Sequence, residues 1–190
     1  MKISDIKTFV VGNPPPHFGG RYWIFLKLIA DNGVVGYGEV YAATFGPHVI
    51  TKMIEDVCQR HVIGSDPFKI EKLWRNVYGS GYTLRPDVSL LGVLSGIEMA
   101  CWDIMGKVLS VPVYQLLGGL YRDRLETYVS DVYWEKDPGP MAKNLERILK
   151  KGFKTIKAHL GCESPEADEK RIDARRCTAG NETNLMIDLN

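Results

Sequence analysis

The sequence lacks the cysteine spacing of a disulfide-stapled or zinc-binding domain. Its four cysteines form no Cys-x-x-Cys pair and are scattered along the chain at Cys58, Cys101, Cys162 and Cys177. A zinc site or a small disulfide scaffold needs cysteines paired at short, regular spacing. Because disulfides persist mainly in oxidising compartments, the pattern favours reduced thiols and a cytoplasmic protein.

The chain also lacks a strong charge of either sign. Its formal net charge is +1, so no overall basic field would gather nucleic acid or anionic lipid. The N-terminus has no signal-peptide apolar run, and the longest apolar windows fall short of a membrane span. We therefore expect neither a nucleic-acid partner nor a membrane partner.

The first part of the chain has the pattern of a small α+β domain, which we place at residues 1–123. Strands are expected at residues 2–11, 21–30 and 34–40, and helices at residues 47–60 and 67–78. The turn Asp31-Asn32-Gly33 joins the second and third strands as an antiparallel pair. Proline lies in the first turn of both expected helices. The expected architecture is an antiparallel meander covered by helices.

The stretch Ser95–Lys107 organises this domain. Apolar residues around it recur at three- and four-residue spacing, which predicts one long buried helix. Gly92, Gly96 and Ala100 lie four apart and form one row without bulk. Since glycine costs roughly 1 kcal/mol relative to alanine inside a helix, we expect a neighbouring backbone to pack closely against this row.

After residue 123 the rhythm changes to strand, helix, strand, helix and strand, which is typical of βα units in a parallel sheet. These elements are expected at residues 125–132, 140–151, 153–160, 165–177 and 185–189. A (β/α) barrel takes about 250 residues and about eight strand–helix pairs. We therefore expect residues 124–190 to be the first part of an incomplete barrel. The chain would be an N-terminal portion of a larger protein, or its missing part would come from another chain.

Chemically active side chains fall at two of the expected strand ends. Lys157 and His159 lie two apart on one strand and so share a face, and Asp188 and Asn190 have the same relation on the next. The carboxyl ends of barrel strands carry the active site. A lysine and an imidazole beside a carboxylate suit a base next to a metal ion. On spacing alone, the commoner interpretation is a solvated strand end.

The long helix and its continuation carry a resemblance to a known family. Residues 96–107 (Gly-Ile-Glu-Met-Ala-Cys-Trp-Asp-Ile-Met-Gly-Lys) and 111–119 (Val-Pro-Val-Tyr-Gln-Leu-Leu-Gly-Gly) resemble the signature of the enolase superfamily. More narrowly, they resemble the mandelate racemase/muconate lactonizing group. Residues 157–161 align with that group's Lys-x-Lys segment and residues 185–190 with its first metal-ligand strand. The resemblance covers essentially the whole chain, in the family's order.

This resemblance implies a capping domain, then a TIM-type barrel, and a magnesium-dependent reaction. Family members bind a carboxylate substrate on Mg²⁺ and remove the proton from the adjacent carbon, and the cation stabilises the ene-diolate that forms. By position, Asp188 is the first Mg²⁺ ligand, Lys157 holds the substrate carboxylate and His159 takes the base position. Asn190 is assigned to substrate binding beside the metal. The commonest family pattern has lysine where His159 stands, which leaves the stereochemistry of proton removal open.

The N-terminal part looks most like acid-sugar dehydratases of the gluconate/galactonate type, especially at residues 12–20 and 36–44. The family's specificity loops come from this domain. His17, Arg21 and Tyr41 are the substrate-binding candidates, because each has a polar or cationic tip suited to a polyhydroxy acid. Each of them could instead serve the fold, for example in an ion pair or in packing.

We therefore expect a Mg²⁺-dependent lyase that dehydrates an acid sugar and forms a homo-oligomer. A second hypothesis is a racemase or cycloisomerase of the same superfamily. A third hypothesis is that the chain is no enzyme but a truncated product that merely associates with partners. The family's other two metal carboxylates and its second acid/base residue belong to later strands. One carboxylate does not hold Mg²⁺ tightly, so the 190-residue chain alone is expected to be inactive. Away from these positions, His48 and His61 are expected at the surface.

Overall fold

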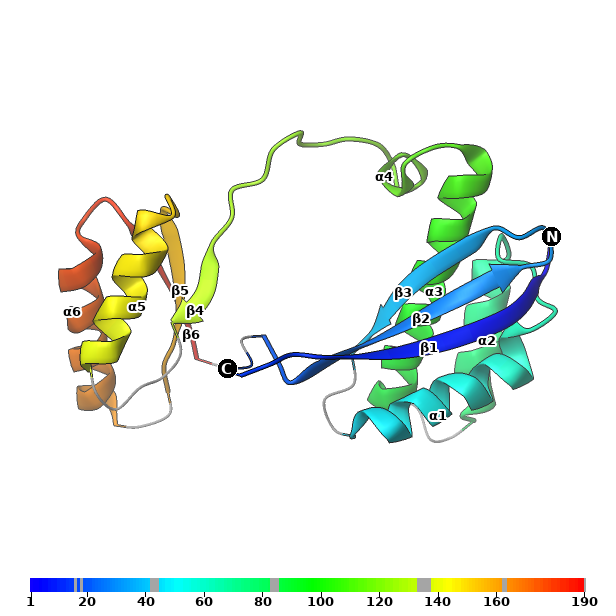
Figure 1. The fold of residues 1–190 in the computed structure, drawn as a ribbon, viewed down its shortest axis with the longest axis horizontal. Coiled ribbons are helices and arrows are strands. Elements are labelled where there is room, and N and C mark those ends of the chain that lie inside the picture. Colours follow the sequence, from blue (N-terminus) through cyan, green and yellow to red (C-terminus); the bar gives the residue numbers. More distant parts are fainter. Residues whose placement is uncertain are drawn as a thin grey trace. The chain divides into compact units, whose positions relative to one another are not determined.

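The computed structural model describes residues 1–15, 17, 19–41, 45–82, 86–132, 138–161 and 164–189. The chain divides into two compact units, Met1–Tyr121 and Arg122–Asn190, here called unit 1 and unit 2 (Figure 1). Each unit has its own sheet and its own buried cluster, so each is described by itself. The domain boundary after residue 123 stays a prediction.

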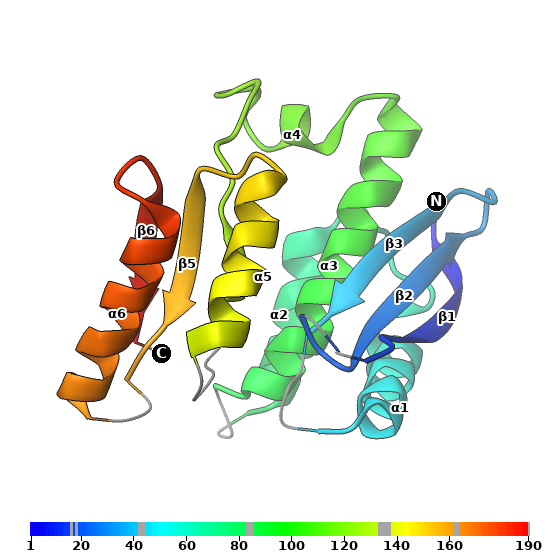
Figure 2. The same ribbon diagram turned by 60° about the vertical axis from the view of Figure 1, so that its left-hand side comes forward.

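Unit 1 is built on a three-stranded antiparallel sheet in the order β1-β2-β3, with β1 at Ile3–Gly12, β2 at Tyr22–Ala30 and β3 at Val35–Val40. Alternate residues of β2, namely Ile24, Leu26 and Leu28, are buried, whereas those between them are half-buried. Because side chains alternate across a strand, one face of the sheet packs on the helices (Figure 2). The predicted meander is confirmed.

The helices of unit 1 are α1 (Pro47–Val57), α2 (Ile70–Ser80), α3 (Val88–Leu109) and the short α4 (Val113–Leu116). Directly after α1 comes a five-residue π-helical turn, η1 (Cys58–Val62), where the sequence predicted a continuous α-helix. The predicted start of α2 is also wrong. The Asp66 carboxylate accepts a hydrogen bond from the Phe68 N–H at 3.0 Å, and this turn delays the helix to Ile70, so Pro67 lies outside its first turn.

α3 and β3 touch backbone to backbone at glycines. A Cβ atom on Gly38 would lie 1.9 Å from the carbonyl oxygen of Gly96, and one on Gly36 would lie 2.0 Å from that of Ala100. No side chain fits in such a space, so the strand can approach the helix this closely only with glycine at both positions. The close approach predicted from the small-residue row of α3 is confirmed at Gly96 and Ala100.

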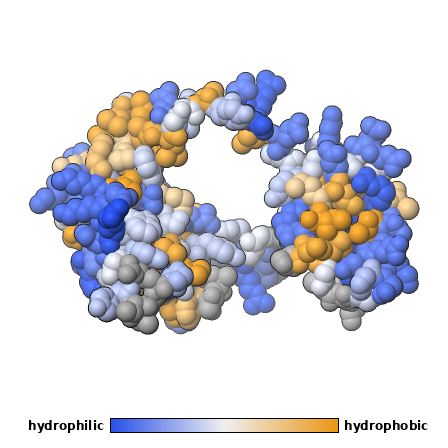
Figure 3. All heavy atoms as spheres, turned by 180° about the vertical axis from the view of Figure 1, so that it is seen from behind, coloured by the Kyte–Doolittle hydropathy of each residue, from blue (hydrophilic) through white to orange (hydrophobic). Residues whose placement is uncertain are grey.

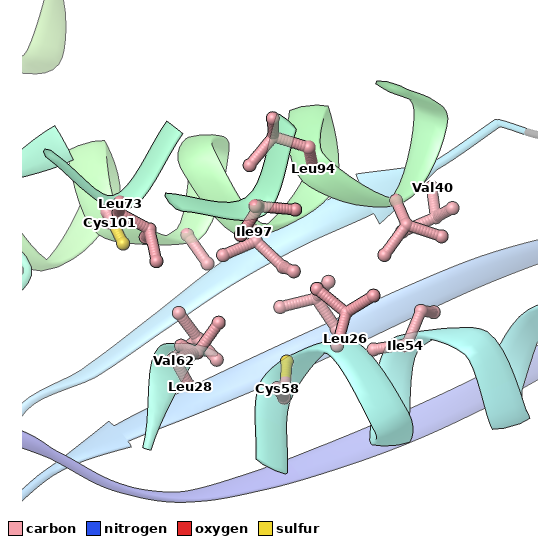
Figure 4. Packing of buried hydrophobic residues seen from close by; sticks show 14 of the residues in the cluster. Leu26, Leu28, Val40, Ile54, Cys58, Val62, Leu73, Leu94, Ile97 and Cys101 are labelled. Atoms are coloured by element: carbon pink, nitrogen blue, oxygen red, sulfur yellow. The ribbon is translucent and has the colours of Figure 1, made fainter. Parts of the chain in front are cut away.

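The expectation that no apolar window reaches the length of a membrane span is wrong for α3. This 22-residue helix is long and apolar enough by length and composition alone. It is, however, the core helix of unit 1: Leu94, Ile97 and Cys101 belong to the buried cluster that also holds Leu26 and Leu28 of β2 (Figure 4). The apolar composition of α3 therefore has a structural reason inside the unit.

Unit 2 consists of β4 (Val129–Val132), α5 (Pro138–Lys150), β5 (Thr155–His159), α6 (Pro165–Ala179) and β6 (Asn184–Asp188). Its three strands are parallel in the order β4-β5-β6, as the alternating pattern predicted. Ile156 of β5 packs with Leu145 and Ile148 of α5. On β6, in contrast, Met186 and Ile187 are 43% and 48% exposed, and Figure 3 shows an apolar patch on this unit.

Candidate active site

The candidate site of unit 2 lies at the carboxyl ends of β5 and β6. Ile156 and Ala158 of β5 are buried. Because successive side chains of a strand point to opposite faces, Lys157 and His159 project to the other face of β5. The parallel register sets His159 beside Asp188. Side chains in register on adjacent strands share a face. The sheet thus brings an ammonium, an imidazole and a carboxylate to one face of one strand edge.

Lys157 and Asp188 form an ion pair across this edge. The Lys157 Nζ lies 2.5 Å from Asp188 Oδ2, and the two side chains are 23% and 32% exposed. The hydrogen bond from Lys157 to Asp188, and with it the carboxylate's charge, raises the pKa of Lys157 above its ordinary value, although partial burial works against this. Lys157 is therefore an ammonium group, which suits the holding of an anion better than the removal of a proton.

The backbone that follows β5 is held in place by hydrogen bonds. The Leu160 N–H donates to the Asp188 carbonyl oxygen at 2.9 Å, and the Gly161 N–H donates to Asp168 Oδ2 at 2.8 Å. Asp168, in the first turn of α6, also pairs with Arg171 at 3.0 Å. These contacts fix the strand end that carries His159.

The described residues of this site include one suitable ligand for a magnesium ion. The Asp188 carboxylate is a hard oxygen ligand of the kind that Mg²⁺ prefers, but the Lys157 ammonium occupies a place beside it at 2.5 Å. Among the residues that the structure describes, no three His, Cys, Asp or Glu side chains gather as a metal site. The donor therefore fits Mg²⁺ in type but not in number, and further ligands would have to come from outside the described residues.

Unit 1 has a pocket of about 480 Å³ where β2 begins and β3 ends. Its lining includes Arg21 and Tyr41, two of the predicted substrate-binding residues, together with Trp23 and Glu39. The third candidate, His17, is exposed and does not line it; its Nδ1 lies 2.5 Å from the Asn13 carbonyl oxygen. The pocket thus presents a guanidinium, a phenol and a carboxylate, a polar set suited to a hydroxylated acid.

Two of these lining residues, Trp23 and Glu39, were not predicted from the sequence to bind substrate, and Trp23 was expected to pack in a core or an interface. Glu39 stands two residues before Tyr41 and therefore projects to the same side of the strand, which is the signal that could have identified it. Trp23 has the same relation to Arg21. Asn190, the remaining substrate-binding candidate, lies outside the described residues.

The two other histidines differ from each other. His48 is exposed, as expected. His61 is half-buried rather than fully exposed, and its Nε2 is buried without a hydrogen-bond partner.

Comparisons with known proteins agree with the resemblance of the sequence. A sequence model described as the mandelate racemase/muconate lactonizing enzyme N-terminal domain matches residues 18–118. The D-galactonate dehydratase of Pectobacterium atrosepticum is 37% identical over 176 residues, which are 92% of this chain and 42% of that protein. The chain therefore spans about half the length of the curated relatives it matches.

Solved structures give the same result. A mandelate racemase/muconate lactonizing enzyme family structure from Labrenzia alexandrii is 44% identical with a TM-score of 0.87, covering 100% of this chain and 52% of that one. The 3,6-anhydro-D-galactonate cycloisomerase of Zobellia galactanivorans is 28% identical with a TM-score of 0.85, covering 99% and 51%. The three-stranded capping sheet with its helices, followed by the start of a parallel-strand barrel, is their shared architecture. The chain belongs to the mandelate racemase/muconate lactonizing enzyme family of the enolase superfamily.

Proposed function

We propose that the chain supplies the capping domain and the first catalytic strands of a lyase that dehydrates an acid sugar of the galactonate or gluconate type. The observation that carries this proposal is the convergence of Lys157, His159 and Asp188 at the ends of two adjacent parallel strands. The similarity to D-galactonate dehydratase over 92% of the chain supports the substrate class.

In this proposal each residue has one role. The Lys157 ammonium binds and orients the substrate carboxylate by charge and hydrogen bonding. An imidazole nitrogen of His159 accepts the proton from the α-carbon as its C–H bond breaks. The electron pair of that bond forms the new carbon–carbon double bond while the β-hydroxyl leaves. With a proton from an acid outside the described residues, this hydroxyl departs as water.

Magnesium belongs to the proposal as the ion that Asp188 would help to hold. When bound, it would supply electrostatic stabilisation of the negative charge that develops on the substrate carboxylate. In unit 1, Arg21, Glu39 and Tyr41 would select the substrate by hydrogen bonds to its hydroxyl groups, and their pocket is the reason for this assignment. The cytoplasmic location and the homo-oligomer remain predictions.

A hybrid protein tests the function. Residues 1–190 replace the matching part of the Pectobacterium atrosepticum D-galactonate dehydratase, 42% of which the chain covers. With Mg²⁺ we expect dehydration of galactonate or gluconate, and exchange of the α-proton in D₂O measured by NMR. His159→Asn should abolish both, whereas His48→Asn, at an exposed position of α1, should change neither. The isolated chain should show no exchange.

Two outcomes would contradict the proposal. A folded hybrid that acts on no acid sugar would exclude the substrate class. A His159→Asn hybrid with full exchange would exclude His159 as the base. Measurable exchange by the isolated chain would leave the reaction in place but refute its predicted inactivity.

A cycloisomerase is the second candidate, favoured by the similarity to the Zobellia galactanivorans enzyme. It requires the same proton removal but a different fate for the electron pair. Product analysis of the hybrid separates the two, because dehydration of an open-chain acid yields a 2-keto-3-deoxy acid and cycloisomerisation yields an isomer of the substrate.

A further inference from the structure

Unit 1 has a second pocket, of about 350 Å³, at the other end of its sheet. The start of β1 pairs with the end of β2, at Ile3 and Ala30, whereas the pocket of Arg21 lies where Gly12 pairs with Tyr22. The second pocket is lined by the chain's first two residues, by the connection after η1 and by α2. It is therefore separate from the candidate substrate pocket.

The walls of this pocket are fixed by backbone hydrogen bonds. The Ile3 N–H donates to the Ser65 carbonyl oxygen at 2.9 Å, and the Gly64 N–H donates to that of Ile3 at 2.8 Å. The Ser65 hydroxyl donates to the Val62 carbonyl oxygen at 2.6 Å. These bonds hold the start of β1 against the connection between η1 and α2, so the backbone on this side of the pocket is positioned before any ligand binds.

The residues that line the pocket carry a net positive charge. Lys2, Lys69 and Lys72 are among them, and each carries an ammonium group. None of the three lysines makes an ion pair within the parts of the chain that the structure describes. One carboxylate, Asp66, opposes them, and its Oδ1 already accepts the Phe68 N–H. Like charges gathered around a concave surface favour an anion between them, because the low-dielectric walls concentrate the field.

A neutral group also points to a ligand. The Nε2 atom of His61 is buried without a partner, whereas buried polar side-chain atoms are usually hydrogen-bonded. His61 belongs to η1, and single π-helical turns occur frequently at functional sites. Burial lowers the pKa of His61, as does Arg60, while Asp56 opposes them. His61 itself lines the pocket, and a neutral imidazole keeps one N–H that can donate to an oxygen beside it.

α2 adds backbone donors. Lys69 is its N-cap residue and makes no side-chain capping hydrogen bond. The first N–H groups of a helix have no intrahelical acceptor, and they carry the positive end of the helix dipole. The N-cap residue Lys69 lines the pocket together with Lys2, Lys72 and His61, so the N-terminal end of α2 lies beside the lysines and the imidazole.

We propose that this pocket binds a small metabolite through a phosphate group. A phosphate carries up to two charges and three peripheral oxygens, which matches several ammonium and N–H donors better than a single planar carboxylate does. A volume of about 350 Å³ lies within the range of small-molecule sites. Occupancy would tie α2 to the start of β1 and so stabilise unit 1.

The test is a titration of the purified chain with inorganic phosphate at constant ionic strength, followed by calorimetry and by NMR of the histidine rings. We expect saturable binding that shifts the His61 signals more than those of His17, His48 and His159. Inorganic pyrophosphate should bind at least as tightly. Malonate, a carboxylate dianion, should bind more weakly and thereby distinguish phosphate from carboxylate recognition.

Charge-matched variants separate a built site from general surface charge. Lys69→Gln combined with Lys72→Gln should weaken phosphate binding roughly tenfold. Lys7→Gln combined with Lys143→Gln removes the same charge at exposed positions outside the pocket and should change the affinity less than about twofold. His61→Asn tests the neutral donor and should weaken binding while the chain stays folded by circular dichroism.

The proposal is overturned if phosphate fails to saturate, or if the His61 signals do not move. It is equally overturned if both double variants weaken binding to the same extent, since only net charge would then matter. Tighter binding of malonate than of phosphate would overturn the phosphate assignment.

Discussion

Unit 1 and unit 2 differ in how completely they cover their sheets. In unit 1 the buried cluster joins β1–β3 with α1, α2 and α3. In unit 2 the described cluster is confined to Met141, Leu145, Ile148, Ile156 and Ala179, and Ile187 of β6 is 48% exposed. Because burial of apolar surface contributes about 25 cal/mol per Å², unit 1 should be much the more stable of the two.

The units also differ in whether a cationic side chain is buried among their described residues. In unit 2 the Arg175 side chain is 1% exposed, and none of its three guanidinium nitrogens has a hydrogen-bond partner. Burial, followed by the charge of Arg171, lowers the pKa of Arg175, while Asp168 opposes this. An unpaired buried charge is costly. Among the described residues of unit 1, no arginine or lysine is buried. We therefore expect that only in unit 2 does the replacement of a buried cationic side chain change the stability.

The largest expected effect is in unit 1, where Gly38→Ala should cost about 4 kcal/mol, more than is usual for overpacking. The new Cβ would lie 1.9 Å from the Gly96 carbonyl oxygen, and neither backbone can yield without separating β3 from α3. Gly12→Ala, in β1 with open space around it, is the matched control and should cost little. Urea unfolding followed by circular dichroism measures both; equal stability of the two variants would contradict the close packing.

The next effect isolates unit 2. Leu145→Ala removes a fully buried side chain from its small cluster and should cost about 3 kcal/mol. We expect amide hydrogen exchange in α5 and β5 to become fast while α3 stays protected. If α3 loses protection in parallel, the two units unfold together and the comparison fails.

A third change should stabilise unit 2. Arg175→Met replaces the unpaired guanidinium with an apolar side chain of similar length, and removal of a buried ionic group in this way can stabilise by about 1–4 kcal/mol. Exposed Arg147 of α5, whose guanidinium donates to Asn144 Oδ1, provides the control, and Arg147→Met should change the stability of unit 2 little. A loss of stability in Arg175→Met would show that the guanidinium has a favourable role that its contacts do not explain.

Sequence patterns predicted the alternation of elements in both units because apolar periodicity reports burial directly. They failed where a local bond competed with that periodicity. The Asp66 side chain accepts the Phe68 N–H and delays α2, and the five-residue turn η1, whose Cys58 and Val62 are buried, has no counterpart in the apolar spacing.

The candidate site was predictable in part. Strand spacing set Lys157 and His159 on one face, but the ion pair between Lys157 and Asp188 depends on the register of two strands, which no local pattern gives. In unit 1, the pocket around Arg21 and Tyr41 depends on where β2 starts and β3 ends. Glu39 and Trp23 join it only because those strands are neighbours in the fold.

The smallest expected effect is a pH dependence confined to unit 1. Burial, and to a lesser extent the charge of Cys101, raises the pKa of the Cys58 thiol to about 12. Burial, and to a lesser extent the charge of Glu98, raises the pKa of the Cys101 thiol to about 12. Thiols in the unfolded chain lose their protons near the ordinary value of 9.0, so between pH 9 and 12 the unfolded state binds fewer protons than the folded one. The free energy of unfolding is therefore unaffected by these thiols below pH 9 and falls as pH rises through that window.

At pH 10 the fall should reach about 1.4 kcal/mol for each thiol. Unfolding free energies measured from pH 8 to 10 check this against a Cys58→Ala, Cys101→Ala double variant, which removes both groups and should show a shallower slope whatever its absolute stability. Cys177→Ser is the control in unit 2, because that cysteine is exposed and its replacement should leave the slope of unit 1 unchanged. Equal slopes in all three proteins would mean that the two buried thiols ionise as readily in the folded chain as in the unfolded one, and that the core of unit 1 is more accessible to water than its packing indicates.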